Sequence, residues 1–156
     1  YFFIKKTKFK NLINKKEFLE HAKVFNNFYG TSKKFVYQKL KKGKNVLFDI
    51  DWQGANQLKN KKLNYRLLSF FILPPSKKVL KQRLTNRHKK DNLIVKERMK
   101  QFEKDVKRWK DYKFVVINDN LKKCYKQILK IIKADLKNKK INYNKKLVEK
   151  HIKKLI

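Results

Sequence analysis

The sequence predicts an α/β protein, in which a parallel sheet is flanked by helices and joined to a small mixed sub-domain. From residue 46 onward, short apolar runs alternate with amphipathic stretches, and strands separated by helices pair in parallel. The first 45 residues contain short aromatic-rich segments instead. With 156 residues, 41% of them hydrophobic, the chain has enough apolar material for a core, which excludes a disordered basic tail.

The N-terminal sub-domain is predicted from aromatic segments that alternate with short helical patterns. The aromatic segments are residues 1–4, 18–25 and 28–31, and the helical patterns are residues 9–14 and 32–40. This combination predicts a small mixed α/β sub-domain over residues 1–45, set on the parallel sheet.

The predicted sheet takes its strands from three apolar runs, at residues 46–50, 67–73 and 114–117. Prolines end the second run and Asn118-Asp119-Asn120 ends the third. Helices are predicted between and after them, from Ser76 to residue 86, from residue 92 to 109, and after Asn120. The core is expected over residues 46–137, with Cys124 on the apolar face of the last helix. Residues 138–156 form a lysine-rich tail that reads as a solvated helix.

The net charge is +33, from 45 basic and 12 acidic residues. Lysine dominates so strongly that composition drift in an AT-rich genome explains the charge better than selected nucleic-acid binding, which usually retains arginine. Non-specific binding of polyanions at low salt follows in either case. No apolar run is long enough to span a membrane, and a single cysteine favours a reducing, cytoplasmic compartment.

The few arginines become informative against this background. The chain has five, and three of them, Arg83, Arg87 and Arg98, fall within sixteen residues. This clustering indicates a site that needs a planar, bidentate cation. Solvated helix arginines are the alternative.

Carboxylates follow the first predicted strand. Asp49 and Asp51 point to the same side of a strand, and open parallel sheets bind ligands beyond the carboxyl ends of their strands. Capping of a following helix is an equally good explanation for the pair, as it is for the residues after the third strand.

Six segments of residues 1–137 are informative when they are taken together: FLEHA at 18–22, NFYGTS at 27–32, DIDWQG at 49–54, FILPPS at 71–76, RLxxR at 83–87 and VIND at 116–119. In their order and spacing they resemble guanylate kinases. The resemblance implies a P-loop-kinase-like fold with a GMP-binding sub-domain over residues 1–45 and a helical lid over about residues 83–98. It also implies transfer of the γ-phosphoryl group of ATP to GMP with Mg²⁺.

The resemblance assigns roles around the GMP. Glu20 matches the glutamate that reads guanine, Thr31 the hydroxyl that faces O6, and Asp51 a second carboxylate on the guanine side. Tyr1 and Tyr29 match tyrosines that bind the GMP phosphate. Guanine presents donors at N1 and N2, so carboxylates are its natural partners, and adenine would leave them unpaired.

The resemblance also assigns roles on the ATP side. Arg83, Arg87 and Arg98 match lid arginines that bind the triphosphate and stabilise the transferred group, which is the main work in phosphoryl transfer. Asn118 matches a contact to the adenine, and Asp49 a carboxylate near the magnesium and its waters, without direct ligation.

Two departures from the family pattern stand out. His88 follows Arg87 where the family usually has glycine, and the phosphate-binding motif Gly-x-x-x-x-Gly-Lys-Ser/Thr does not occur. We expect that motif, with a serine and two arginines that grip GMP, upstream of Tyr1. The 156-residue chain alone is therefore predicted to be nearly inactive. The alternative function is a catalytically dead kinase-like module that binds a protein or RNA.

Overall fold

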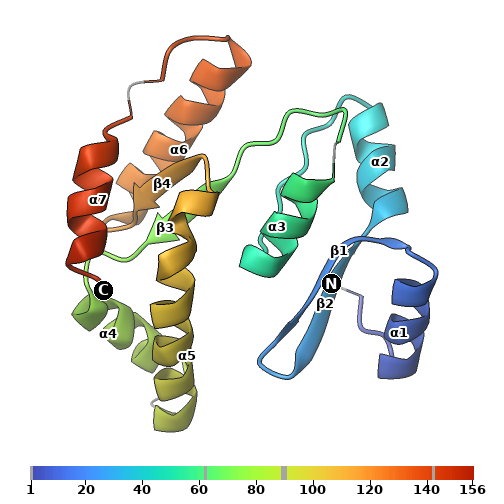
Figure 1. Ribbon diagram of the computed structural model, residues 1–156, viewed down its shortest axis with the longest axis horizontal. Coiled ribbons are helices and arrows are strands. Elements are labelled where there is room, and N and C mark those ends of the chain that lie inside the picture. Colours follow the sequence, from blue (N-terminus) through green and yellow to red (C-terminus); the bar gives the residue numbers. More distant parts are fainter. Residues whose placement is uncertain (1, 62, 89–90, 142) are drawn as a thin grey trace. The chain divides into compact units, whose positions relative to one another are not determined.

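The computed structural model describes residues 2–61, 63–88, 91–141 and 143–156 (Figure 1). It divides into two compact units, Tyr1–Leu67 and Leu68–Ile156, each of which is described by itself. Both units combine helices with a strand pair, and the pair in the second unit is parallel. The predicted α/β class is confirmed, although the first unit extends beyond residue 45 to include the segment that follows it.

The first unit is built on an antiparallel hairpin of β1 (Phe18–Val24) and β2 (Asn27–Ser32). Phe25 and Asn26 form the two-residue turn, with φ of 46° and 64°. Positive φ at both central residues is typical of the turns whose twist matches that of the flanking strands. The hairpin places Glu20 opposite Thr31, and Ala22 opposite Tyr29.

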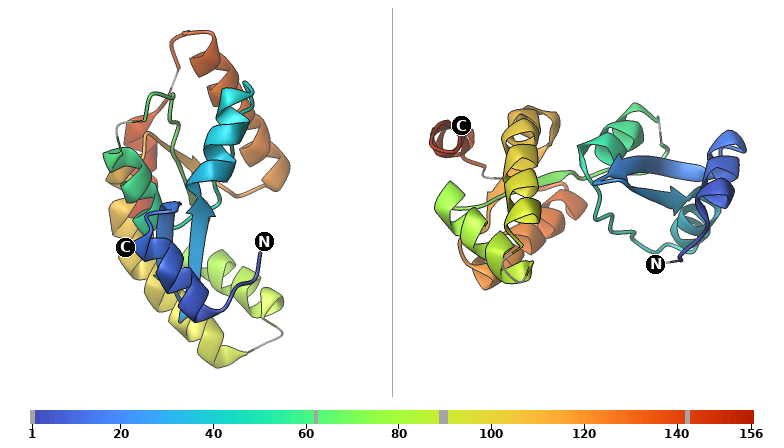
Figure 2. Two further views of the ribbon diagram at one scale, coloured as in Figure 1. Left: turned by 90° about the vertical axis from the view of Figure 1, so that its right-hand side faces the viewer. Right: turned by 90° about the horizontal axis from the view of Figure 1, so that it is seen from below.

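Three helices pack on this hairpin: α1 (Lys6–Asn14), α2 (Lys33–Lys41) and α3 (Trp52–Asn60). The Phe9 ring of α1 lies 4.6 Å from that of Phe18 and 5.5 Å from that of Phe28. Figures 1 and 2 show α3 on the side of the hairpin away from α1. The core between the hairpin, α2 and α3 is formed by Leu19, Val36 and Leu58.

The predicted buried strand at residues 46–50 is wrong. These residues belong to no strand in the described part of the chain, since no neighbouring strand pairs with them there. Their side chains alternate: Val46, Phe48 and Ile50 pack against the first unit's core, whereas Leu47 and Asp49 are exposed. The apolar run therefore covers one face only, and it packs with the hairpin and α3.

The second unit is built on β3 (Phe70–Leu73) and β4 (Phe114–Ile117), which pair in parallel. The chain crosses from β3 to β4 through α4 (Lys77–Arg87), α5 (Asn92–Asp105) and the 3₁₀ helix η1 (Val106–Asp111), and α6 (Leu121–Leu136) follows β4. Figure 2 shows α5 and α6 on opposite sides of the strand pair. Successive strand residues face opposite sides. β4 is buried at Phe114, Val115 and Val116, whereas Ile72 of β3 is exposed.

The capping side chains fix where these helices begin. Ser76 accepts a hydrogen bond from the Val79 N–H at 3.2 Å, and Asn120 accepts one from the Lys123 N–H at 3.1 Å. The predicted helix over residues 92–109 changes to 3₁₀ geometry at Val106. Val106 and Trp109 are both buried, and a spacing of three residues places both on one face of a 3₁₀ helix.

The C-terminal segment is not a solvated helix. Helix α7 (Lys145–Lys153) buries one face in the second unit's core. That core consists of Leu73, Val106, Trp109, Val115, Val148, Ile152 and Leu155. The lysines between the apolar positions hide this face in the sequence. Tyr143, which precedes α7, accepts a hydrogen bond from the Val115 N–H at 2.9 Å, and His151 Nε2 lies 2.9 Å from the Pro74 carbonyl oxygen.

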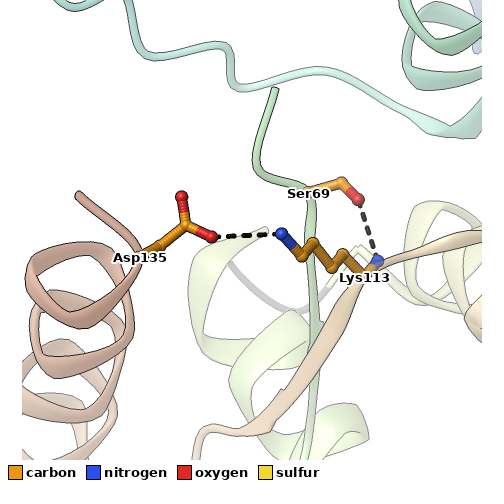
Figure 3. A network of polar contacts seen from close by, with 3 residues as sticks. All are labelled: Ser69, Lys113 and Asp135. Carbon is orange, nitrogen blue, oxygen red and sulfur yellow. Dashed lines mark hydrogen bonds and ion pairs between the residues drawn. The ribbon is translucent and has the colours of Figure 1, made fainter. Parts of the chain in front are cut away.

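A polar contact also joins β4 to α6 (Figure 3). The Lys113 N–H donates to Ser69 Oγ at 2.9 Å, and Lys113 Nζ lies 3.1 Å from Asp135 Oδ1. The lysine side chain is half exposed, so this ion pair contributes little to stability. It joins the residue before β4 to the last turn of α6.

Replacing Ile152 with alanine is expected to lower the free energy of unfolding of the chain by about 2–4 kcal/mol, because it opens a cavity in this core. The control is Leu147→Ala on the same helix, whose side chain is 58% exposed and should change stability by less than about 0.5 kcal/mol. Urea unfolding followed by circular dichroism measures both. Equal effects of the two substitutions would mean that α7 is solvated after all.

Candidate functional site

A buried carboxylate lies at the centre of the first unit. Among the described residues, Glu20 is the one charged side chain that is buried, with 3% of its surface exposed. Its partner is Thr31 on the opposite strand, whose hydroxyl donates a hydrogen bond to Glu20 Oε1. A carboxylate that is buried away from water needs such donors. Its two oxygens can accept further hydrogen bonds besides the one from Thr31.

Helix α3 begins beside this carboxylate. A Cβ atom on Gly54 would lie 2.5 Å from Glu20 Oε2, so no larger residue fits there without moving the glutamate. Asp51 caps the helix: its Oδ1 accepts from the Gln53 and Gly54 N–H groups at 3.0 and 3.2 Å. The structure thus brings Glu20, Thr31 and Asp51 together around Gly54. The capping explanation for Asp51 is confirmed, while Asp49 is exposed and takes no part in the cap.

Two further side chains of α3 and its end reach the backbone of β1. The amide of Gln57 accepts from the His21 N–H at 3.2 Å and donates to the His21 carbonyl at 2.7 Å. The ammonium group of Lys61 donates to the Leu19 carbonyl. Burial lowers the pKa of Lys61, the charge of Lys33 lowers it further, and Glu20 opposes both.

The supporting roles of Gly54, Gln57 and Lys61 were missed. Gly54 and Gln57 share one face of α3 and Lys61 directly follows this helix, but their spacing does not indicate contact with β1 until the strand beside α3 is known.

The predicted phosphate-binding tyrosines have different outcomes. Tyr29 lies on β2, two residues from Thr31 and hence on the same face of the hairpin, and 46% of its surface is exposed. Its phenol is therefore accessible beside the Glu20–Thr31 pair. Tyr1 lies outside the described residues.

In the second unit, Arg83 binds the end of β4. Its two terminal nitrogens donate to the carbonyl oxygens of Asn118 and Asp119, at 2.8 and 3.0 Å. This is the bidentate geometry that arginine provides and lysine does not. The structure thus joins two predicted site residues, Arg83 and Asn118, through the backbone of the latter.

The other two candidate arginines, Arg87 and Arg98, lie on α4 and α5. Arg87 ends α4 and is exposed, one turn beyond Arg83, and Arg98 lies half-buried on α5, which packs against α4. His88 follows with a φ of −103°, a value that needs no glycine. The unusual histidine is therefore compatible with the end of α4.

The described residues contain no group of three or more His, Cys, Asp or Glu side chains that could hold a metal ion. Asp49 is exposed, and a single carboxylate suffices for a magnesium ion that keeps several waters and binds through the phosphates of a nucleotide.

A family model described as guanylate kinase matches residues 1–135 of the chain. The chain belongs to this family. It is 48% identical over 134 residues to a guanylate kinase of Buchnera aphidicola subsp. Baizongia pistaciae, covering 86% of this chain and 64% of that protein. It is 42% identical over 135 residues to a guanylate kinase of Jannaschia sp., covering 86% of this chain and 62% of that protein.

A crystal structure supports the same assignment. The guanylate kinase from Anaplasma phagocytophilum matches with a TM-score of 0.71 and 29% sequence identity, over 86% of this chain and 64% of that one. The chain thus spans less than two thirds of the length of these three guanylate kinases. Helix α7 lies beyond the residues that the family model matches. No helix in the described residues is long and apolar enough to cross a membrane.

Proposed function

We propose that the complete protein transfers the γ-phosphoryl group of ATP to GMP, giving ADP and GDP. The observation that carries this proposal is the buried Glu20 carboxylate, held by Thr31 and flanked by Gly54 and Asp51. Family membership favours a nucleotide phosphotransferase, and the chemistry of this carboxylate favours guanine as the acceptor base.

Guanine complements this pair of side chains. Its N1–H and N2–H₂ groups are donors that suit Glu20, and its O6 atom is an acceptor that suits the Thr31 hydroxyl. That hydroxyl has one proton, with which it donates a hydrogen bond to Glu20 in the free protein. When GMP binds, the hydroxyl turns to O6 and the glutamate accepts from the base instead. The carboxylate then loses the hydrogen bond of Thr31 and gains those of the N1–H and N2–H₂ groups.

Adenine would fit this pocket poorly. Its N1 atom accepts and would face the acceptor oxygens of Glu20, and adenine has no 2-amino group to donate to them. The Thr31 hydroxyl can accept from the 6-amino group, so the mismatch lies at Glu20. A site built to bond one set of donors rejects an analogue that lacks them by factors of about 10⁴–10⁵. In this proposal Asp51 adds a second acceptor on the guanine side, and Tyr29 and Tyr1 bind the GMP phosphate.

The second unit supplies the ATP side. Arg87 and Arg98 neutralise the charge on the transferred phosphoryl group, and Asn118 contacts the adenine. Arg83 holds the backbone of Asn118 and Asp119, which supports a role in shaping the adenine contact as well as in phosphate binding. When bound with ATP, magnesium would neutralise charge on the phosphates, and Asp49 of the first unit would be the carboxylate near the ion and its waters.

The test is an assay of the complete protein with ATP and GMP, in which ADP and GDP are measured together. Equal amounts of both products, formed with Mg²⁺ and suppressed by EDTA, are expected. The isolated 156-residue chain, which has no phosphate-cradling motif, should form them much more slowly. If the complete protein forms no GDP, the binding-module alternative is favoured; rapid turnover by the isolated chain would contradict the expected need for a phosphate cradle.

A further inference from the structure

The backbone on both sides of Glu20 is held by α3. Gln57 bonds both polar backbone groups of His21, and Lys61 donates to the carbonyl of Leu19. Glu20 itself lies opposite Thr31 of β2. Neighbouring residues of a strand direct their backbone groups to opposite edges. One edge of β1 is therefore paired with β2, and the other is bonded by Gln57 of α3 and by Lys61, which directly follows this helix.

Contact with α3 extends to the carboxylate as well. Gly54 stands so close to Glu20 that an added Cβ would lie 2.5 Å from Oε2 and 3.2 Å from Cδ. Gly54 and Gln57 lie three residues apart on one helix face. A single face of α3 thus fixes the strand through Gln57 and limits the carboxylate through Gly54.

We propose that Gln57 and Gly54 are positioning residues for GMP selection, which set the place of the Glu20 carboxylate without touching the nucleotide. The inference rests on the proposed function, in which Glu20 reads guanine. The Gln57 amide fixes the position of α3 along β1 through its two hydrogen bonds to His21. Because Gly54 has no side chain, the helix can lie close to Glu20. Recognition of this kind requires that a side chain be held to within about 0.5 Å by its supporting residues.

Loss of the Gln57 amide leaves the His21 N–H and carbonyl groups without these partners. They then require water, which must enter between α3 and β1. The helix shifts, and Glu20 moves with respect to Thr31 and Asp51. GMP binding weakens, whereas the ATP side, which belongs to the other unit, is unchanged.

The first variant is Gln57→Met in the complete protein, since methionine is of similar length, unbranched and a good helix former. We expect the KM for GMP to rise about tenfold, with kcat and the KM for ATP changed by less than about twofold. Gln38→Met is the matched control, because Gln38 is exposed on α2. The role of Gln57 would be overturned if Gln57→Met and Gln38→Met had the same KM for GMP. It would also be overturned if Gln57→Met raised the KM for ATP as much as the KM for GMP.

The second variant is Gly54→Ala, which leaves the Gln57 side chain unchanged and favours the helix while pushing on Glu20. It should show the same selective rise in the KM for GMP, and an unchanged KM would overturn the role of Gly54. If Gln57→Met does not fold, Gly54→Ala still tests whether α3 positions Glu20.

Glu20→Gln distinguishes a failure of the proposed function from a failure of the positioning role of α3. If it leaves GMP kinetics unchanged, the proposed function fails together with this inference. If it weakens GMP and the α3 variants do not, only the positioning role fails.

Discussion

Glutamine in place of Glu20 in the complete protein is expected to lower kcat/KM for GMP by about 10²–10⁴-fold, with little change in the KM for ATP. The amide group brings a donor against the donors of guanine, in a site where only 3% of the side chain is exposed and water cannot compensate. Glutamine can still accept the hydrogen bond of Thr31, so the fold should persist. Steady-state kinetics with each nucleotide varied in turn measure the effect.

The control for this substitution is Glu17→Gln. Glu17 lies three residues earlier, just before β1, and its side chain is exposed. It removes the same charge from the chain without changing the buried pair. If Glu20→Gln reduced the use of GMP and ATP equally, the loss would reflect a general change in structure and the guanine assignment would be wrong.

Alanine in place of Arg87 is expected to lower kcat by about 10²–10³-fold while both KM values change by less than about threefold. A guanidinium that meets the transferred phosphoryl group acts mainly in the transition state, so its loss appears in kcat. Arg87 is exposed at the end of α4, and its removal leaves the packing of the unit intact. Arg87→Lys should restore only part of the rate, because lysine lacks the planar fork.

Lys81→Ala is the matched control for Arg87, since it removes an exposed cation from the same helix. It should leave kcat within about twofold of the parent value, as a surface substitution far from the chemistry does. If Arg87→Ala lowered kcat no more than Lys81→Ala does, Arg87 would have no catalytic role.

Local signals predicted much of the fold. Ser76 and Asn120 begin helices where the sequence indicates, because a capping side chain acts within three residues of its own position. The strand Phe114–Ile117 has the predicted bounds, since a short apolar run ends directly at polar turn residues.

Features that depend on distant partners could not be read in this way. The run at residues 46–50 is as apolar as a buried strand, yet its role depends on whether another strand pairs with it. The apolar face of α7 is interrupted by lysines, and its burial depends on a core provided by β3, β4 and η1. Local composition does not carry either fact.

The same distinction applies to the candidate site. Glu20, Thr31 and Asp51 were identified from motifs, and the structure brings them together. The residues that hold them were missed, because the contacts of Gln57 and Lys61 with β1 join positions 36 and 42 residues apart. A glutamine on a helix has no distinctive spacing until the strand beside it is known.

The most direct test of guanine selection by the buried carboxylate is a comparison of GMP with AMP as acceptor for the complete protein at saturating ATP. The kcat/KM for GMP is expected to be at least about 10³-fold above that for AMP. Comparable values for the two nucleotides would contradict this selection, because the Glu20–Thr31 pair would then have no part in choosing the base.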